Sequence, residues 1–493
     1  MAKKILIIGA GPGGLAAAMM LASRGFHVEV FEKKKTIGGS NSRLKLGDFM
    51  FDKGPTFLNM AYIAEDVFAY AGKNLHDYIR MIELTELYEL IFDETSLKVT
   101  QDIEEMKRRI DQIAPGDGDG YLRFMKKTKR KMNVLVPILQ SKMDKFYHYA
   151  SWRVVRALPW LSLTKSLYND VSSYFKDERI KQAFTFQSNY LGMSSWESPG
   201  LFSILPYIEH EYGVFHPEGG INQLSKAMAK AAAELGAIIY LEKGVRKLVL
   251  DGKIVKGVEL FSGERIEADE VIVNSDFAHT MTTMVDEGVL KKYSKRRLEN
   301  KSYSCSAYTM YLGLDKCYPL SHHTIVFAND YKRNSEQLTK SFELPDDPSI
   351  YIQNASVTDS TLAPKGGSAL YIHVPVPNSK SGIDWDKHEE RFRELVFDTI
   401  EKRTSFNDLR KHVVIEKTIT PKQWEEDMSI YKGAIYSLSH MLSQLMVMRP
   451  HNQFEELENC WLVGGATHPG SGLPTILESA KITAKAIVKK EKH

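Results

Sequence analysis

The sequence predicts an α/β fold of the Rossmann-like type, in which helices cover a parallel sheet. Two stretches carry this prediction. The apolar run 5–8 leads into a glycine-rich turn, an alanine-rich helix and a second apolar run at 28–31. Near the other end of the chain, the apolar run 460–463 also breaks into a glycine- and proline-rich turn and a helix. A strand-rich segment between about 300 and 440 predicts an additional mixed β-sheet.

The first turn has the pattern of a dinucleotide-binding turn in its full context of strand, helix and terminal acid. It contains Gly9, Gly11, Pro12, Gly13 and Gly14. Gly9 permits the tight turn, Gly11 lets the backbone approach a pyrophosphate, and Gly14 lets the helix pack closely on the strand. The helix start offers N–H donors and a positive dipole end to the phosphates. Glu32 follows the second strand, beside Lys33, where its carboxylate can accept hydrogen bonds from ribose hydroxyls.

The composition is that of an ordinary globular protein. Its 493 residues are 43% hydrophobic and 26% charged, with a formal net charge of +3, and they suffice for two or three domains. The three cysteines lie far apart in the sequence, which argues against a disulfide framework or a cysteine-based metal site. The chain contains no apolar run long enough to predict a transmembrane helix, and the glycine turn argues against a cleaved signal peptide. We therefore expect an intracellular protein.

Residues 126–165 combine positive charge with apolar and aromatic side chains. The segment contains ten lysines and arginines but only one acidic residue, Asp144. Tyr147, Tyr149 and Trp152 lie among the basic residues. This mixture is typical of helices that lie in a membrane surface. The alternative is a solvated basic face on a helical domain. We do not expect nucleic-acid binding, because no binding module accompanies the charge. Upstream, the run 114–120 is rich in glycine and aspartate and predicts a loop.

Several motifs together resemble the flavin-dependent carotenoid desaturase family, which includes phytoene and diapophytoene desaturases and carotenoid isomerases. They are the pair Gly38-Gly39, the turn Asp52-Lys53-Gly54-Pro55-Thr56, and the string Thr467-His468-Pro469-Gly470-Ser471-Gly472-Leu473-Pro474. The resemblance covers nearly the whole chain. It implies an amine-oxidase-like flavoprotein with FAD as its cofactor, a mixed β-sheet substrate domain and a helical membrane-facing cap.

The resemblance also implies a domain organisation. The FAD-binding domain is expected to be discontinuous and to consist of residues 1–95, 215–300 and 440–493. A substrate-binding domain is expected at 300–440, and the helical cap at 96–214.

The resemblance assigns further residues to the FAD site. These are Gly38, Gly39, Arg43, Gly54, Pro55, Thr56, Val245, Gly464, Gly465, Gly472, Leu473 and Pro474. Asn274 and Asp276 follow a predicted strand that ends at the edge of the site. The family usually has arginine directly after the glycine pair, but this chain has Ser40 there, so Arg43 is expected to make the phosphate contact instead.

The chemistry expected from the resemblance is carried by the flavin. A linear precursor such as phytoene or its thirty-carbon counterpart loses an allylic hydride to flavin N5, and the neighbouring carbon loses a proton. A quinone or oxygen is the expected electron acceptor. No metal motif is present in the sequence. Glu209, His210 and Glu211 are candidates for a base, although surface or structural roles are favoured for each.

Two other activities stay open at this point. A carotenoid cis–trans isomerase of the same family changes double-bond geometry without net oxidation. An amine oxidase or protoporphyrinogen oxidase shares the flavin fold, but the Thr-His-Pro-Gly string disfavours it. The expected partners are a long apolar isoprenoid and a membrane surface, which the segment 126–165 contacts peripherally from the cytoplasm.

Overall fold

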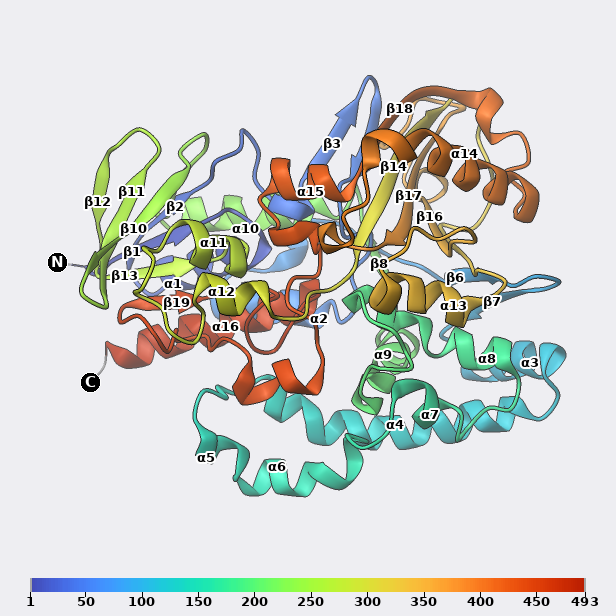
Figure 1. Cartoon of the computed structure of the whole chain (residues 1–493), viewed down its shortest axis with the longest axis horizontal. Coiled ribbons are helices and arrows are strands. Elements are labelled where there is room, and N and C mark those ends of the chain that lie inside the picture. Colours follow the sequence, from blue (N-terminus) through green and yellow to red (C-terminus); the bar gives the residue numbers. More distant parts are fainter. Residues whose placement is uncertain (1, 492–493) are drawn as a thin grey trace.

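A computed structural model describes residues 2–491 (Figure 1). A five-stranded parallel sheet forms one half of the molecule, with strand order β19-β13-β1-β2-β9. Its strands are β1 (Lys4–Ile8), β2 (His27–Phe31), β9 (Ile238–Tyr240), β13 (Glu270–Val273) and β19 (Cys460–Leu462). Strands from both ends and from the middle of the chain therefore share one sheet.

Helices cover this sheet. Helix α1 (Pro12–Ala22) packs against α10 (Asn222–Glu234) and α16 (Leu473–Lys490). Every residue of α1 from Gly13 to Ala22 is buried, which explains why the helix is built from alanine, leucine and methionine. The antiparallel strands β10 (Val245–Asp251), β11 (Ile254–Leu260) and β12 (Arg265–Glu267) form a separate sheet beside it. The predicted strand–turn–helix units at both ends of the chain are confirmed.

A seven-stranded mixed sheet forms the other half, with the order β18-β14-β17-β16-β15-β6-β7. Its strands are β6 (Glu86–Ile91), β7 (Ser96–Thr100), β14 (Ser306–Leu314), β15 (His323–Val326), β16 (Ile350–Asn354), β17 (Ser368–Val376) and β18 (Val413–Ile419). Helix α14 (Trp385–Arg403) packs on one face. The other face contacts β4 (Phe49–Asp52), which pairs with β3 (Arg43–Leu46), and α15 (Pro421–Met428).

The predicted domain boundary at residue 95 does not coincide with the sheets. Strand β6 pairs in parallel with β15, and β7 extends the same sheet. The segment from 86 to 100 thus belongs structurally with the sheet of residues 300–440. Sequence pattern alone could not reveal this, because the pairing joins residues more than 200 positions apart.

The helices of the cap lie together at one side of the molecule, below the sheets in Figure 1. They are α3 (Ile103–Ile113), α4 (Asp117–Leu139), α5 (Phe146–Tyr149), α6 (Trp152–Ala157), α7 (Leu167–Val171), α8 (Glu178–Ala183) and α9 (Ile204–Tyr212). The remaining short elements include α2 (Tyr62–Tyr70), α11 (Phe277–Thr283), α12 (Lys295–Glu299), α13 (Tyr331–Glu336), β5 (Met81–Glu83) and β8 (Phe215–Pro217). Among the described residues, no helix is both long and apolar enough to span a bilayer.

The predicted loop at 114–120 is wrong in its second half, where α4 begins at Asp117. The aspartates favour this helix start, because negative charge in a first turn is stabilised by the helix dipole. Asp117 also accepts hydrogen bonds from the backbone N–H groups of Lys176 and Asp177. Gly120 allows close packing, since a Cβ at this position would overlap the carbonyl oxygen of Tyr174.

The basic segment 126–165 is not uniformly exposed. Lys131 is buried, and its ammonium group lies 2.9 Å from Asp170 and 2.7 Å from the Ser203 hydroxyl. Lys129 pairs at the surface with Glu211 at 2.8 Å. Lys131 therefore forms an ion pair inside the helical cap and is not part of a surface that could bind a membrane.

Candidate functional site

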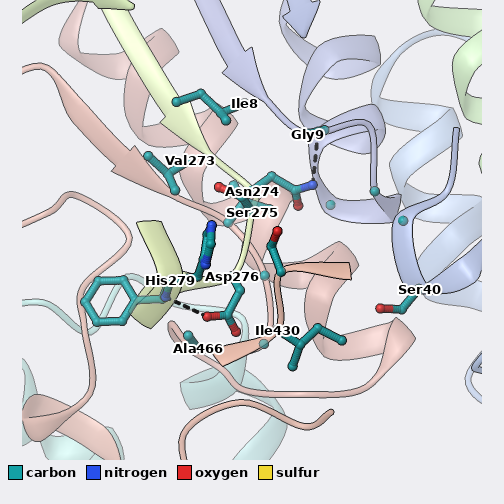
Figure 2. A pocket seen from close by; sticks show the side chains of 18 of the residues that line it. Ile8, Gly9, Ser40, Val273, Asn274, Ser275, Asp276, His279, Ile430 and Ala466 are labelled. Atoms are coloured by element: carbon teal, nitrogen blue, oxygen red, sulfur yellow. Dashed lines mark hydrogen bonds between the residues drawn. The ribbon is translucent and has the colours of Figure 1, made fainter. Parts of the chain in front are cut away.

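A cavity opens at the carboxyl ends of the parallel strands (Figure 2). The last residues of four strands line it, namely Ile8, Phe31, Val273 and Leu462. Ligands of open parallel sheets bind at this edge, because the loops that follow the strands converge there. The cavity therefore lies where the topology predicts a binding site.

The first glycine turn forms one wall of the cavity. Gly9 has a φ of +97°, and its carbonyl oxygen accepts a 3.1 Å hydrogen bond from the Asn274 side chain, which Figure 2 shows. Helix α1 begins after Gly11, and no side chain among residues 2–491 caps it. Its first-turn N–H donors are thus available to an anionic group. Gly14 lies behind the wall, where a Cβ would overlap the Gly9 carbonyl oxygen.

Glu32 is held at the cavity wall by two backbone hydrogen bonds. One carboxylate oxygen accepts from the N–H of Ala10 and the other from the N–H of Lys34, each at 2.9 Å. The side chain is buried and lines the cavity. Each oxygen keeps a further lone pair, so the same carboxylate can fix the glycine turn and accept hydrogen bonds from a ligand hydroxyl.

Asp276 and His279 lie together just after β13, at the carboxyl edge of the sheet. Asp276 caps α11 by accepting a 2.9 Å hydrogen bond from the N–H of His279, as Figure 2 shows. Burial raises the pKa of Asp276 to about 6 and lowers the pKa of His279. His279 was not predicted, although an aspartate three residues before it is a signal for a helix start that faces the site.

The second wall comes from the turn after β19. Gly464, Gly465, Ala466 and Thr467 line the cavity, and a Cβ at Gly464 would meet no atom within 4 Å. The segment 428–437 closes the same side through residues such as Ile430, labelled in Figure 2. The sequence carries no motif for this segment, because its position depends on packing between distant parts of the chain.

Twelve of the residues predicted to bind the cofactor line this cavity. They are Gly9, Gly11, Pro12, Gly13, Glu32, Lys33, Gly39, Val245, Asn274, Asp276, Gly464 and Gly465. Nine others lie outside its lining, namely Gly14, Gly38, Arg43, Gly54, Pro55, Thr56, Gly472, Leu473 and Pro474. Ser40, which replaces the arginine of the family pattern, does line it.

Several of these nine support the residues of the wall. The N–H of Gly38 donates to the carbonyl of Ala10 at 2.8 Å. A Cβ at Gly54 would lie 2.6 Å from the carbonyl oxygen of Ser40. Gly472 is the N-cap of α16, which starts with Leu473 and Pro474. The contact at Gly54 explains why glycine is required there, because a side chain would displace Ser40, which lines the cavity.

Arg43 and Thr56 make contacts away from the lining. The Arg43 guanidinium donates a hydrogen bond to the carbonyl of Gly219. The Thr56 hydroxyl lies 2.6 Å from the Tyr351 hydroxyl, at the border with the seven-stranded sheet. Arg43 lies outside the cavity lining, and its phosphate contact stays a prediction.

The three candidate bases do not act as a group. Glu209 is buried, accepts a 2.8 Å hydrogen bond from Tyr88 and a 3.1 Å bond from Gln187, and burial raises its pKa to about 7. His210 lies 3.2 Å from the Tyr121 hydroxyl, and burial lowers its pKa to about 4. Glu211 forms the surface ion pair with Lys129 described above. Each side chain therefore has a different environment, and all three lie outside the lining of the cavity.

The sequence matches a known family over almost its entire length. The model of the flavin containing amine oxidoreductases matches residues 12–488. The chain belongs to the flavin-containing amine oxidoreductase family.

Curated relatives place this family member beside carotenoid desaturases. It is 47% identical to a 4,4'-diapophytoene desaturase (4,4'-diapolycopene-forming) from Methylomonas sp, over 99% of this chain and 96% of that protein. It is 34% identical to an all-trans-zeta-carotene desaturase from Myxococcus xanthus, over 98% of this chain and 92% of that protein. A 4,4'-diapophytoene desaturase (4,4'-diaponeurosporene-forming) from Staphylococcus aureus is 31% identical, over 99% of both chains.

Solved structures show the same fold at low identity. An oxidoreductase from Methanosarcina mazei aligns with a TM-score of 0.64 and 16% identity, over 99% of this chain and 100% of that one. Cyclohexylamine oxidase from Brevibacterium oxydans aligns with a TM-score of 0.61 and 16% identity, over the full length of both. The amine-oxidase-like architecture is thereby confirmed.

The cavity fits the cofactor of the family. Gly464 leaves open space where a side chain would project, and the uncapped start of α1 offers N–H donors at the wall. Glu32 provides hydrogen-bond acceptors at the end of β2. This protein is an FAD-dependent oxidoreductase. Within residues 2–491, no group of three or more His, Cys, Asp or Glu side chains is arranged to hold a metal ion.

Proposed function

We propose that this protein desaturates a linear carotenoid precursor of the 4,4'-diapophytoene type. The observation that carries the proposal is the 47% identity, over almost the whole chain, to a diapophytoene desaturase. The cofactor cavity supports it, because desaturation requires an oxidant and this chain belongs to a flavin family. A cis–trans isomerase is disfavoured, since the curated relatives named above are all desaturases.

Each desaturation removes a hydride and a proton from two neighbouring carbons, and a double bond forms between those carbons. FAD, when bound, supplies the hydride-accepting chemistry. The first glycine turn and Glu32 would hold its dinucleotide part, and the Gly464–Gly465 turn would border its flavin part. A quinone or oxygen is the final electron acceptor in this proposal.

In this proposal the substrate binds at the border of the seven-stranded sheet, near Tyr351. Tyr311, Tyr351 and Tyr371 lie on its face opposite α14, with ring centroids 5.4 Å apart for Tyr311 and Tyr371 and 6.3 Å apart for Tyr351 and Tyr371. Tyr311 donates a 2.7 Å hydrogen bond to the carbonyl of Lys53, so this face adjoins the turn before Thr56. Tyr311 and Tyr371 are buried, with Tyr311 packed against Phe51 of β4, and of the three rings Tyr351 alone is partly exposed. The Tyr351 ring can offer an apolar surface to a polyene and stabilise the positive charge that develops when a hydride leaves.

A membrane surface supplies the substrate in this proposal. The supporting observation is the exposed apolar surface of α5 and α6, where Tyr147 is 68% and Trp152 is 75% exposed. Val155 and Leu158 continue this surface at helical spacing from Trp152. Arg153 is exposed beside them. Apolar and aromatic side chains that are flanked by arginine fit an interfacial helix that docks on anionic lipid.

The experiment that tests the desaturase proposal uses cells that make 4,4'-diapophytoene or, separately, phytoene. Pigments are extracted with and without this protein and analysed by mass and absorbance. The proposal predicts products that lack hydrogens in pairs and absorb at longer wavelengths, with 4,4'-diapophytoene as the better substrate. Products of unchanged mass with altered retention would identify an isomerase instead. No change with either precursor, in cells that hold FAD-loaded protein, would refute the proposed substrate class.

A further inference from the structure

Arg449 is a positive charge enclosed behind the second wall of the FAD cavity. Its side chain is 1% exposed. Arginine is rarely buried to this extent unless a carboxylate pairs with it, because an ionised group loses much of its hydration in the protein interior. The environment of this residue therefore needs an explanation.

Carbonyl oxygens and one imidazole surround the guanidinium. It donates to the carbonyls of Leu438, Ser439, Gln444 and Gly465 and to Nε2 of His440. The bond to Gly465, at 2.6 Å, is the shortest of the five. Within residues 2–491, none of its hydrogen-bond acceptors is a carboxylate. The positive charge is thus solvated by dipoles and is not neutralised.

The charge stays on Arg449 at neutral pH. Burial lowers the pKa of Arg449 to about 10, which still leaves the group protonated. His440 cannot share this charge, because its Nε2 accepts from Arg449 at 3.2 Å and from the N–H of Ser471 at 3.1 Å. Burial and the adjacent arginine also lower the pKa of His440 well below its usual range. The imidazole is therefore neutral, and it links the guanidinium to the far end of the same turn.

Gly465 connects this charge to the cofactor. The residue lines the cavity, and its carbonyl accepts a hydrogen bond from Arg449, which lies outside the lining. We infer that Arg449 is a positioning residue that raises the reduction potential of the bound flavin by placing an unneutralised positive charge behind the Gly465 wall. Reduction adds negative charge to a flavin, and a nearby cation in a medium of low dielectric favours that form.

The test compares the flavin midpoint potential of three FAD-loaded variants with that of the native protein. Arg449→Gln removes the charge but keeps amide donors, and Arg449→Lys keeps the charge. Asn452→Ala is the matched control, because Asn452 donates a neutral hydrogen bond to the same turn at the His468 carbonyl, at 3.1 Å. The inference predicts that Arg449→Gln lowers the ratio of reduced to oxidised flavin at a fixed potential at least tenfold, about 30 mV for a two-electron couple. Arg449→Lys and Asn452→Ala should stay within threefold of the native ratio.

Two outcomes would overturn the inference. One is an unchanged potential in FAD-loaded Arg449→Gln, and the other is an equal shift in Arg449→Gln and Arg449→Lys, which would make the role structural. If Arg449→Gln does not retain FAD, the FAD dissociation constants of the two Arg449 variants are compared instead. Arg449→Lys is then expected to bind FAD as the native protein does. Loss of FAD binding in both variants would contradict a role of the charge. The potential is measured without substrate, so the result of this test does not depend on the proposed desaturation.

Discussion

Glu209 is a carboxylic acid enclosed in the protein interior with only neutral hydrogen-bond donors, Tyr88 and Gln187, on its Oε2 atom. Its pKa of about 7 in the folded protein compares with an ordinary value of 4.5. The folded state therefore binds this proton more tightly than the unfolded state. The contribution of Glu209 to the free energy of unfolding is fully present below pH 4.5 and is lost as the pH rises through about 7.

Glu209→Gln should remove this loss, because the amide stays neutral at every pH. The expected result is that the difference in unfolding free energy between pH 5 and pH 8 narrows, by up to about 3 kcal/mol. Urea unfolding at the two pH values measures it. Glu211→Gln is the control, since Glu211 is paired at the surface and should leave the difference unchanged. An unaltered pH dependence in Glu209→Gln would show that the carboxyl is already ionised at neutral pH.

The Glu32 carboxylate is expected to contribute directly to FAD binding. Glu32→Gln removes the negative charge that faces the cavity while an amide oxygen can still accept from Ala10. A hydrogen bond to a charged group contributes about 1.5–3 kcal/mol, so FAD affinity should fall by about tenfold or more. Titration of the apoprotein with FAD, followed by flavin fluorescence, measures this change.

Glu29→Gln is the matched control for Glu32, because Glu29 lies on β2, just before Glu32, and pairs with Lys4 at 3.0 Å, away from the cavity lining. Its FAD affinity should equal that of the native protein. Equal losses in both variants would mean that the effect comes from the strand and not from the ligand contact.

Single residues were predictable where a local motif defines them. The residues of the first glycine turn and Glu32 belong to a contiguous pattern whose geometry is the same in many proteins. Arg43 and Glu209 show the limit. The partner of Arg43 is Gly219 and the partner of Glu209 is Tyr88, each more than 100 positions away, and nothing local in the sequence specifies these contacts.

At the scale of elements, the contact between α1 and β1 depends on one missing Cβ. Gly14→Ala would improve helix propensity by about 1 kcal/mol. The added methyl group would nevertheless overlap the Gly9 carbonyl oxygen, and such overpacking costs about 1–3 kcal/mol. We expect a lower melting temperature and weaker FAD binding, because the displaced residue belongs to the cavity wall.

Gly25→Ala serves as the control for this helix. It lies beyond the end of α1 with a φ of +84°, and a Cβ there meets no atom within 4 Å. It should cost about 1–2 kcal/mol from backbone strain alone and leave FAD affinity unchanged. FAD affinity lowered equally in both variants would contradict the packing argument for Gly14.

The exposed apolar surface of α5 and α6 is expected to dock on the membrane. The triple change Trp152→Ser, Val155→Ser and Leu158→Ser should abolish binding to liposomes that contain anionic lipid, as measured by cosedimentation, while FAD stays bound. Val414→Ser is the control, because Val414 is 56% exposed on β18, far from α6 in Figure 1. Undiminished liposome binding by the triple variant would exclude this surface as the docking site.

Elements were predicted well where the chain pattern is local. The two strand–turn–helix units follow from apolar runs and turn residues. The run 114–120 was misread because its glycines serve close packing and its aspartates begin a helix. The buried pair of Lys131 and Asp170 shows the same limit, since charge composition does not reveal which lysine faces inward.

The cofactor cavity lies at the carboxyl ends of the parallel strands, and segments from several distant parts of the chain line it. Sequence motifs predicted that both chain ends share one domain, because each carries part of a single fingerprint. They did not predict that β6 and β7 join the mixed sheet, nor that residues 428–437 close the cavity. Both features arise from pairing and packing between distant segments, for which this sequence carries no local signal.

The central claim, an oxidative desaturation that uses FAD, is tested most directly by a single anaerobic turnover. FAD-loaded protein is mixed with liposomes that contain 4,4'-diapophytoene, without any other electron acceptor, and flavin absorbance and product mass are followed together. The account predicts that the flavin bleaches and that each reduced flavin corresponds to one product double bond and the loss of two hydrogens. A product of unchanged mass formed without flavin bleaching would contradict it.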